Sequence, residues 1–507
     1  MTDLKAIINT FSKEESQSFI QYLEKKNKRN DTKNIQLFKL LTKTEDNEDI
    51  CGQLYKNQEK GAYHALRKRL YQSLIDFIAN SKIEEENSVD MQLIKYILAS
   101  RNFLLHKQYK TAYKILDKAE QLAKEHHLFS ILNEIYHTKI QYVSNHPDVD
   151  IEEIIKKFKL NQKQLYTEDQ LNIVYAKIRQ TLNDITYKGK IVDFQTLLDN
   201  TLSEYEIELN DAMSFKMLYQ LMSIISISAF VTNDYLQIET FLIETYQKAK
   251  EHKTKEKQLF YHIEVLYMVA NTLFRNKKFE QSLIYLEQMY SYMQSNKAKY
   301  YKNFILKYNL LLALNYNYSN QQKKAIGLLE QFKINKHPDL ESLLDINLSL
   351  VMFYFQNEEL HKAMQLFAKF YHTDKWYIEK AGKEWTIKKN LMEIILHIEM
   401  RHDDMVESRL KSFKRSYTKY LKQINQERVL TYLTLVESYY KSSEKVKTPT
   451  FKDNVEKSFD WIEAKREDIF VMSFYAWLKS KMESKPLFYT TMELIKKAQT
   501  VNLPLKN

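Results

Sequence analysis

The sequence predicts an all-α protein, a solenoid of antiparallel helix pairs with a helical cap at each end. Only 5 glycines and 5 prolines occur in 507 residues, whereas a β-rich or α/β chain of this length needs many more turn residues. Leu, Lys, Glu, Gln and Ala, which favour helices, are frequent in the periodic segments. An amphipathic pattern also recurs about every 42 residues, a period typical of stacked helix pairs.

Residues 1–82 are expected to form an N-terminal helical module or cap, because they show helical periodicity but not the repeat. Ser12 and Glu15 have the spacing of a capping box, in which each side chain bonds the backbone N–H of the other residue. Further helices are predicted through residues 35–41 and 58–79.

Residues 83–424 carry the repeat, and residues 96–123 are its clearest unit: two helices joined by a turn at residues 106–108. The second helix places an aromatic, a small, a large and a small residue on one stripe. Short polar turns of this kind make neighbouring helices antiparallel. About eight units are expected, their second helices beginning near Tyr109, Asp150, Ile191, Tyr235, Phe279, Gln322, Leu360 and Met405.

Residues 425–507 are expected to form a C-terminal helical cap. Helices are predicted through residues 429–436, 455–464 and 469–482, and a last helix from Pro486 to Ala498. A cap is needed because the end unit of a solenoid would otherwise expose an apolar face.

The repeated stripe, seen in Tyr109, Ala112, Leu116 and Ala119, resembles that of tetratricopeptide repeats. The resemblance covers roughly residues 83 to 424 and implies a right-handed solenoid whose concave face is lined by the first helix of each pair. The chain departs from the family in its longer period, about 42 residues against 34, and in lacking the motif's glycines and closing proline. A longer period implies longer helices, as in the peptide-sensing regulators of the Rap and Rgg type.

The sequence contains no recognisable catalytic or metal-binding set, so we expect neither an enzyme nor a cofactor. The single Cys51 excludes an intramolecular disulfide and a multi-cysteine zinc site. The nearest histidine cluster, His126 and His127 with His137, lacks the spacing of a metal motif. None of the glycines lies in a phosphate-binding loop.

The candidate binding residues are polar side chains expected on the concave face. Asn can pair with a peptide backbone, Arg can hold a carboxylate through two hydrogen bonds, and Tyr offers rigid contact area. The alternative explanation for this pattern of polar residues is that they form the ordinary solvent-exposed stripe of a long helix and bind no partner. The candidates are Arg101, Tyr142, Arg179, Asn183, Tyr187, Tyr267, Asn271, Arg275, His397 and Arg401.

The predicted function is therefore a non-enzymatic scaffold or adaptor that binds a protein or peptide on its concave face. The net charge of +11 suits an acidic partner only weakly, because a solvated Lys-rich surface also explains it. The alternative is a ligand-sensing regulator whose basic N-terminal module contacts nucleic acid through residues such as Lys26 and Arg67.

A cytoplasmic location is expected, without membrane insertion. The N-terminus lacks the basic and apolar regions of a signal peptide. The longest strongly apolar run, residues 221–231, is shorter than the 18 or so residues that span a bilayer.

Overall fold

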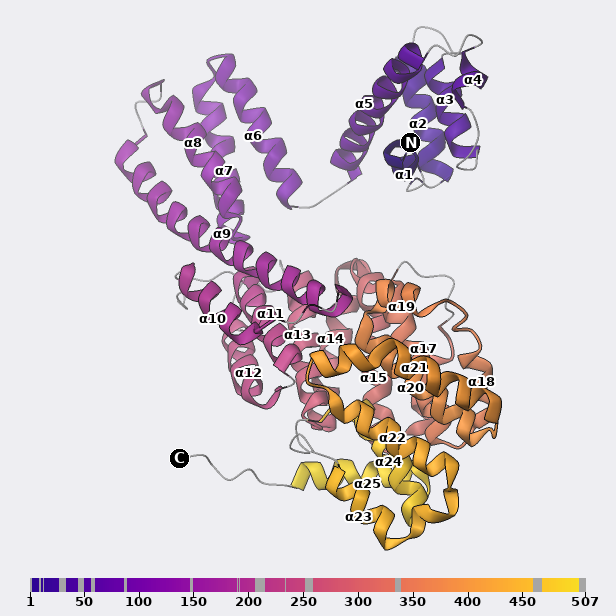
Figure 1. The fold of residues 1–507 in the computed structure, drawn as a ribbon. Helices are drawn as coiled ribbons and strands as arrows, with labels where there is room; N and C mark the ends of the chain where they lie inside the picture. Colours follow the sequence, from indigo (N-terminus) through magenta and orange to yellow (C-terminus); the bar gives the residue numbers. More distant parts are fainter. Residues whose placement is uncertain are drawn as a thin grey trace. The chain divides into compact units, whose positions relative to one another are not determined.

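The computed structural model is all-α, and the residues that it describes contain no strand (Figure 1). This agrees with the predicted fold class at the level of helix content. The structure describes residues 2–8, 11, 13–26, 33–43, 50–55, 60–85, 89–145, 149–188, 190, 192–205, 215–232, 234–250, 259–332, 339–458 and 467–500.

The chain divides into two compact units, Met1–Phe158 and Lys159–Asn507. The boundary falls within one long helix, α9, and each unit has buried cores of its own. The division differs in position from the three predicted segments, whose solenoid and cap roles stay predictions.

The first part of the first unit packs a small helical core in which Phe19, Leu23, Phe38 and Leu70 are almost fully buried. Helices occur at the predicted places, whereas Ser12 of the predicted capping box lies outside the described residues. The helices are α1 (Thr2–Ile8), α2 (Lys13–Lys26), α3 (Lys33–Lys43), α4 (Ile50–Leu54) and α5 (Lys60–Glu85).

The second part of the first unit contains the clearest predicted helix pair. The predicted stripe packs as expected, because Ala112, Leu116 and Ala119 are fully buried. Tyr113 is buried as well, and its hydroxyl donates to the Lys139 carbonyl at 2.5 Å. The elements are α6 (Val89–Leu105), α7 (Tyr109–Glu125), α8 (Phe129–Tyr142) and the short 3₁₀ turn η1 (Val143–Asn145).

Helix α9 (Ile151–Lys188) corrects the number of helices predicted in this stretch. The repeat predicts second helices from near Asp150 and Ile191, and helices begin at Ile151 and Phe194. It also requires a break between these two starts, where one unit ends and the next begins, but one continuous helix of 38 residues occupies this stretch. The physical reason is that residues 151–188 contain neither Gly nor Pro, so nothing in them ends a helix.

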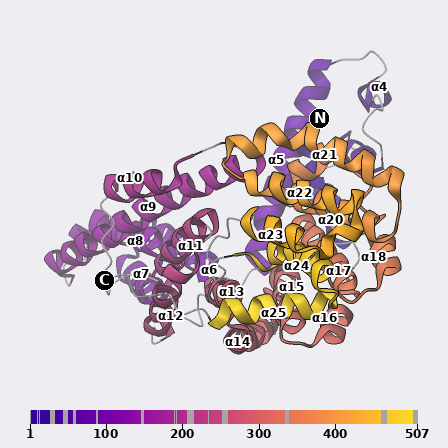
Figure 2. The same ribbon diagram turned by 60° about the horizontal axis from the view of Figure 1, so that its bottom comes forward.

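The second unit contains the remaining helices (Figures 1 and 2). Helices begin at Phe279, Gln322 and Leu360, where the repeat predicts them, and within two residues of Tyr235 and Met405. The elements are α10 (Phe194–Glu204), α11 (Phe215–Thr232), α12 (Leu236–Lys250), α13 (Leu259–Arg275), α14 (Phe279–Ala298), α15 (Tyr301–Tyr318), α16 (Gln322–Leu329), α17 (Leu340–Gln356), α18 (Leu360–Phe367), α19 (Asp374–Ala381), α20 (Lys383–Glu399), α21 (Asp403–Gln423), α22 (Glu427–Lys441), η2 (Ser443–Lys447), α23 (Pro449–Ser458), α24 (Ile469–Glu483) and α25 (Leu487–Thr500).

Helix α11 is long and apolar enough, by length and composition, to cross a membrane. Several of its residues, including Phe215 and Met222, are nevertheless fully buried among residues of α12 and α13. A core helix of a folded domain passes the same test of length and composition.

One turn geometry recurs between helices and explains how so many helices can end without a glycine. A non-glycine residue adopts the left-handed conformation, with φ between 51° and 62°, and the next N–H donates to the carbonyl five residues earlier at 2.8–3.0 Å. This is the Schellman arrangement that usually requires Gly. The left-handed residues are Lys107, His127, Lys277, Asn320, Glu358, Arg401 and Asn425.

Exposed Glu358, at φ 61°, allows a test of this turn. We expect Glu358→Gly to be more stable than Glu358→Ala by about 1 kcal/mol, because only Gly adopts a positive φ without steric cost. The measurement is the denaturation midpoint of both variants. At exposed Lys323, inside α16, the order should reverse, because Gly destabilises an ordinary helical position. The same order at both positions would contradict the assignment.

Helix α24, the second-last helix of the chain, runs past the ends of three earlier helices. Asp468, just before α24, pairs with Arg275 at the end of α13. Ser473 accepts a hydrogen bond from Gln356 at the end of α17, at 2.9 Å. Trp477 Nε1 donates to Glu399 at the end of α20, at 2.8 Å. These three contacts therefore connect α24 and its N-cap to residues up to 193 positions away in the sequence.

Candidate functional site

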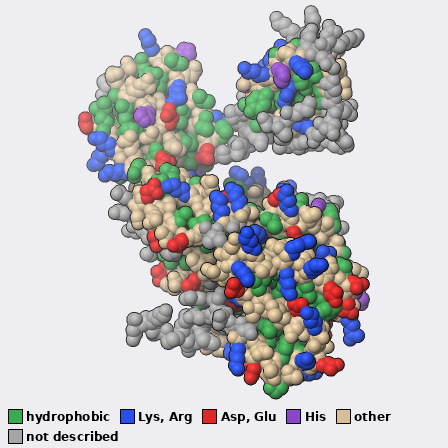
Figure 3. Space-filling view, in the orientation of Figure 1, with side chains coloured by type: hydrophobic (Ala, Val, Ile, Leu, Met, Phe, Trp, Pro, Cys, Tyr) green, Lys and Arg blue, Asp and Glu red, His purple; other side chains and the backbone are tan. Residues whose placement is uncertain are grey.

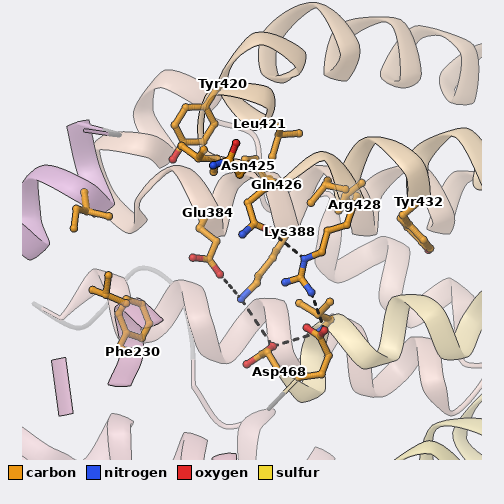
Figure 4. Close-up of a pocket in the computed structure, with 18 of the residues that line it drawn as sticks. Phe230, Glu384, Lys388, Tyr420, Leu421, Asn425, Gln426, Arg428, Tyr432 and Asp468 are labelled. Carbon is orange, nitrogen blue, oxygen red and sulfur yellow. Dashed lines mark hydrogen bonds and ion pairs between the residues drawn. The ribbon is translucent and has the colours of Figure 1, made fainter. Parts of the chain in front are cut away.

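A cavity of about 440 Å³ lies within the second unit (Figure 4). The ends of α9, α11 and α13, the start of α20, the turn between α21 and α22, and the start of α24 supply its lining. Apolar side chains form much of the wall, among them Phe230, Ile387, Leu391, Leu421 and Val471.

The ion pair between Arg275 and Asp468 connects α13 to α24 at this cavity. Asp468 is also the N-cap of α24, and its Oδ1 accepts from the backbone N–H groups of Phe470 at 3.0 Å and Val471 at 3.3 Å. Burial alone would raise the pKa of Asp468, but the charges of Lys388 and Arg275 and the hydrogen bond from the Val471 N–H lower it to about 2. Asp468 therefore stays ionised.

Lys388 extends the pair into a row of alternating charges. Its Nζ lies 2.9 Å from Glu384 Oε1 and 3.9 Å from Asp468 Oδ1. Figure 4 shows the Lys388 ammonium between these two carboxylates. Burial opposes the charge of Lys388, but Glu384 and Asp468 outweigh it and raise the lysine's pKa. The row from Glu384 through Lys388 and Asp468 to Arg275 is thus fully ionised.

A second pair, Arg428 with Glu467 at 2.7 Å, lies beside this row. Gln426 Oε1 accepts from Arg428 Nε at 3.0 Å, which leaves the Gln426 amide nitrogen as a donor. The Glu467 side chain is only 2% exposed, and its Oε1 has no hydrogen-bond partner among the described residues. Burial raises the pKa of Glu467 although Arg428 opposes the shift. Lys277 Nζ donates to the Glu467 carbonyl at 2.8 Å.

The acids and bases of these two groups are thus paired with each other across the cavity wall. A molecule in the cavity would therefore contact apolar surface and oriented dipoles, because the charged groups of these two sets already have partners of opposite charge. Such a surface suits a ligand that combines apolar groups with hydrogen-bonding groups.

Near these cations, α17 carries a pair of carboxyl groups with raised pKa values. Burial, followed by the neighbouring charge of Glu341, raises the pKa of Asp345 to about 7. Glu341 is four residues earlier on the helix, and burial raises its pKa too. Tyr187 of α9 interacts with Glu341, and burial together with that carboxylate raises the Tyr187 pKa to about 12.

The structure brings one predicted binding residue, Arg275, into the cavity wall. Tyr187 lies beside Glu341, as described, and Tyr267 is half-buried on α13, where burial raises its pKa. Arg179 donates to the Tyr175 hydroxyl at 3.3 Å. Of the two predicted amides, Asn183 on α9 is exposed and Asn271 on α13 is half-buried.

The other predicted residues do not line this cavity. Arg101 and Tyr142 belong to the first unit, where Arg101 pairs with Glu134 and Tyr142 packs against the core around Leu104. His397 is buried and lies with its Nδ1 3.1 Å from that of His402. Arg401 occupies the left-handed turn after α20.

The main charged residues of the cavity are absent from the set predicted from the sequence: Glu384, Lys388, Arg428, Glu467 and Asp468. Asp468 does carry a local signal, because an Asp directly before the apolar run that begins at Ile469 is typical of an N-cap. Its pairing with Arg275 has no such signal, because the two residues are far apart in the sequence.

No protein-family model matches the sequence, and no curated protein matches it either. Among the described residues, no group of three or more His, Cys, Asp or Glu side chains is arranged to hold a metal ion.

Replacing Asp468 with Asn tests the central ion pair. Asn keeps the N-cap but removes the charge, which leaves Arg275 and Lys388 without their shared partner; we expect a loss of about 3 kcal/mol of unfolding free energy at neutral pH. Because the folded-state pKa of Asp468 lies below the ordinary value of 3.8, this stabilisation is present above about pH 4 and is lost as the pH falls toward 2.

Denaturant unfolding at several pH values measures this difference between the wild type and Asp468→Asn. Asp453→Asn, at an exposed position on α23, is the matched control and should change little. Equal effects of the two substitutions at neutral pH would contradict the role of Asp468.

Asp345 should behave in the opposite way. Because its pKa is raised to about 7 by folding, the folded state holds the proton more tightly than the unfolded state, and stability falls as the pH rises from about 4 to 7. Asp345→Asn should therefore raise the unfolding free energy at pH 8 by roughly 2 kcal/mol, discounted for the partial exposure of the side chain, and by less at pH 5. Exposed Asp169→Asn is the control. A pH-independent effect of Asp345→Asn would contradict the raised pKa.

Proposed function

We propose that the protein is a non-enzymatic, tetratricopeptide-like helical solenoid that binds a peptide segment of a partner protein in the cavity between α13, α20 and α24. The observation that carries the proposal is the cavity itself: one apolar, charge-balanced site assembled from helix ends that are far apart in the sequence.

The repeated helix boundaries support the solenoid arrangement. Helices begin at Phe279, Gln322 and Leu360, and the left-handed turns at Lys277, Asn320 and Glu358 precede them by two residues each. Such short, similar turns place successive helices side by side, as in stacked helix pairs.

The lining chemistry supports a peptide as the ligand. Phe230 is 47% exposed and lies at the end of α11, where it can pack against an apolar side chain. Gln423, Asn425 and Gln426 supply amide groups around the turn between α21 and α22, and amides can pair with both the N–H and C=O groups of a backbone. The cations here are already paired with acids, so the cavity itself does not favour an acidic peptide.

The alternative function, a regulator with a nucleic-acid-binding N-terminal module, has less support. Of the basic residues on which it depends, Lys26 is paired with Asp76 at 3.1 Å, and Arg67 lies 5.9 Å from the Tyr63 ring.

A cytoplasmic location and the absence of membrane insertion remain part of the leading proposal.

Affinity purification of the tagged protein from its host, with partners identified by mass spectrometry, tests the peptide site. Phe230→Asp places a charge in the apolar wall and should weaken partner binding by at least about tenfold, because hot-spot aromatic residues contribute 2 kcal/mol or more. Arg275→Glu is less informative, because it would put two acids beside each other in the fold.

Ile284→Asp is the matched control, because Ile284 is 56% exposed on α14 and does not line the cavity. Melting curves of both variants are needed to show that each one folds. If Phe230→Asp retains the same partners as Ile284→Asp, the cavity is not the binding site.

A further inference from the structure

Helix α21 carries a row of positively charged side chains that lie outside the proposed peptide-binding cavity. Lys411, Arg415, Lys419 and Lys422 are all exposed on this helix. Figure 3 shows Lys and Arg side chains gathered over the part of the molecule that Figure 1 labels α21 and α22. No Asp or Glu occurs between Glu407 and Glu427.

The four cations lie on one side of the helix. Successive positions three or four residues apart advance by about 5 to 6 Å along the axis, and all four fall within about 80° of the helix circumference. They therefore form a stripe roughly 16 Å long.

Among the described residues, these cations differ from their neighbours in forming no ion pair. Arg409 of the same helix pairs with Glu393 at 2.8 Å, and Lys414 pairs with Glu437. Within the part of the chain that the structure describes, none of the four stripe residues forms an ion pair. Four adjacent unpaired cations repel one another, which an anionic partner would relieve.

The opposite side of α21 restricts the choice of partner. Its apolar residues, including Leu410, Phe413 and Tyr417, are buried in the core of the unit. The helix therefore has no free apolar face to insert into a bilayer. A regular row of cations instead matches a polymer with closely and regularly spaced charges, as the phosphates of nucleic acids are.

We propose that Lys411, Arg415, Lys419 and Lys422 bind the phosphate backbone of nucleic acid. Contacts of this kind position a strand and do not read its sequence. The inference is independent of the peptide cavity, because none of the four residues lines it.

Fluorescence anisotropy of a fluorescein-labelled oligothymidine, titrated with the purified full chain, tests the proposal. The triple variant Lys411→Glu, Arg415→Glu, Lys419→Glu should bind at least about tenfold more weakly, and its plot of log K against log salt should be less steep by about 2, since each lost phosphate contact removes about 0.7 from the slope.

The chain offers a matched control at the same spacing. Lys110, Lys114 and Lys118 also lie four residues apart and are exposed on α7, but Asp117 and Glu120 accompany them on that helix. Lys110→Glu, Lys114→Glu, Lys118→Glu changes the net charge equally and should leave affinity and slope unchanged.

Three results would overturn the inference. These are equal weakening by both triple variants, no salt-dependent binding of oligothymidine or of a duplex by the wild type, and binding of phosphatidylserine vesicles without binding of either oligonucleotide. If the Glu variant does not melt cooperatively, the corresponding Gln variant provides the same comparison with a smaller charge change, and retention of full affinity by that variant also overturns the proposal.

Discussion

The ion pair between Arg275 and Asp468 is the interaction on which the second unit most depends. It joins the end of α13 to the start of α24 across 193 residues, and Asp468 simultaneously caps α24. Two partly buried charges are costly unless each is well paired, and here Lys388 and the backbone N–H groups of α24 complete the pairing. The helix and the charge network therefore stabilise each other.

The cavity forms because this ion pair holds the start of α24 against the end of α13. Its wall combines the ends of early helices with the turn after α21 and the start of α24, so no single segment of the chain contains the site. We therefore expect a substitution in the charged row to affect folding as well as ligand binding. Phe230, which is exposed and outside the row, separates the two effects.

Local features of the fold could be predicted from the sequence, and distant ones could not. Helix starts at Tyr109, Phe279 and Leu360 follow from amphipathic periodicity, which is a property of a few neighbouring residues. The continuous helix α9 was missed because a repeat period was extended through a stretch without a helix-ending residue. Of the residues that line the cavity, only Arg275 is among the binding residues predicted from the sequence. Its pairing with Asp468 could not be predicted, because only tertiary packing brings the two residues together.

The path of α24 past the ends of α13, α17 and α20 also bears on how this chain can change in length. In an open repeat array each unit touches only its neighbours, so a duplication or deletion of one unit preserves every remaining contact. Here Asp468, Ser473 and Trp477 engage helix ends at fixed intervals. A helix pair inserted or deleted between α13 and α20 would break at least one of these contacts, so α24 fixes the number of helices in this part of the chain.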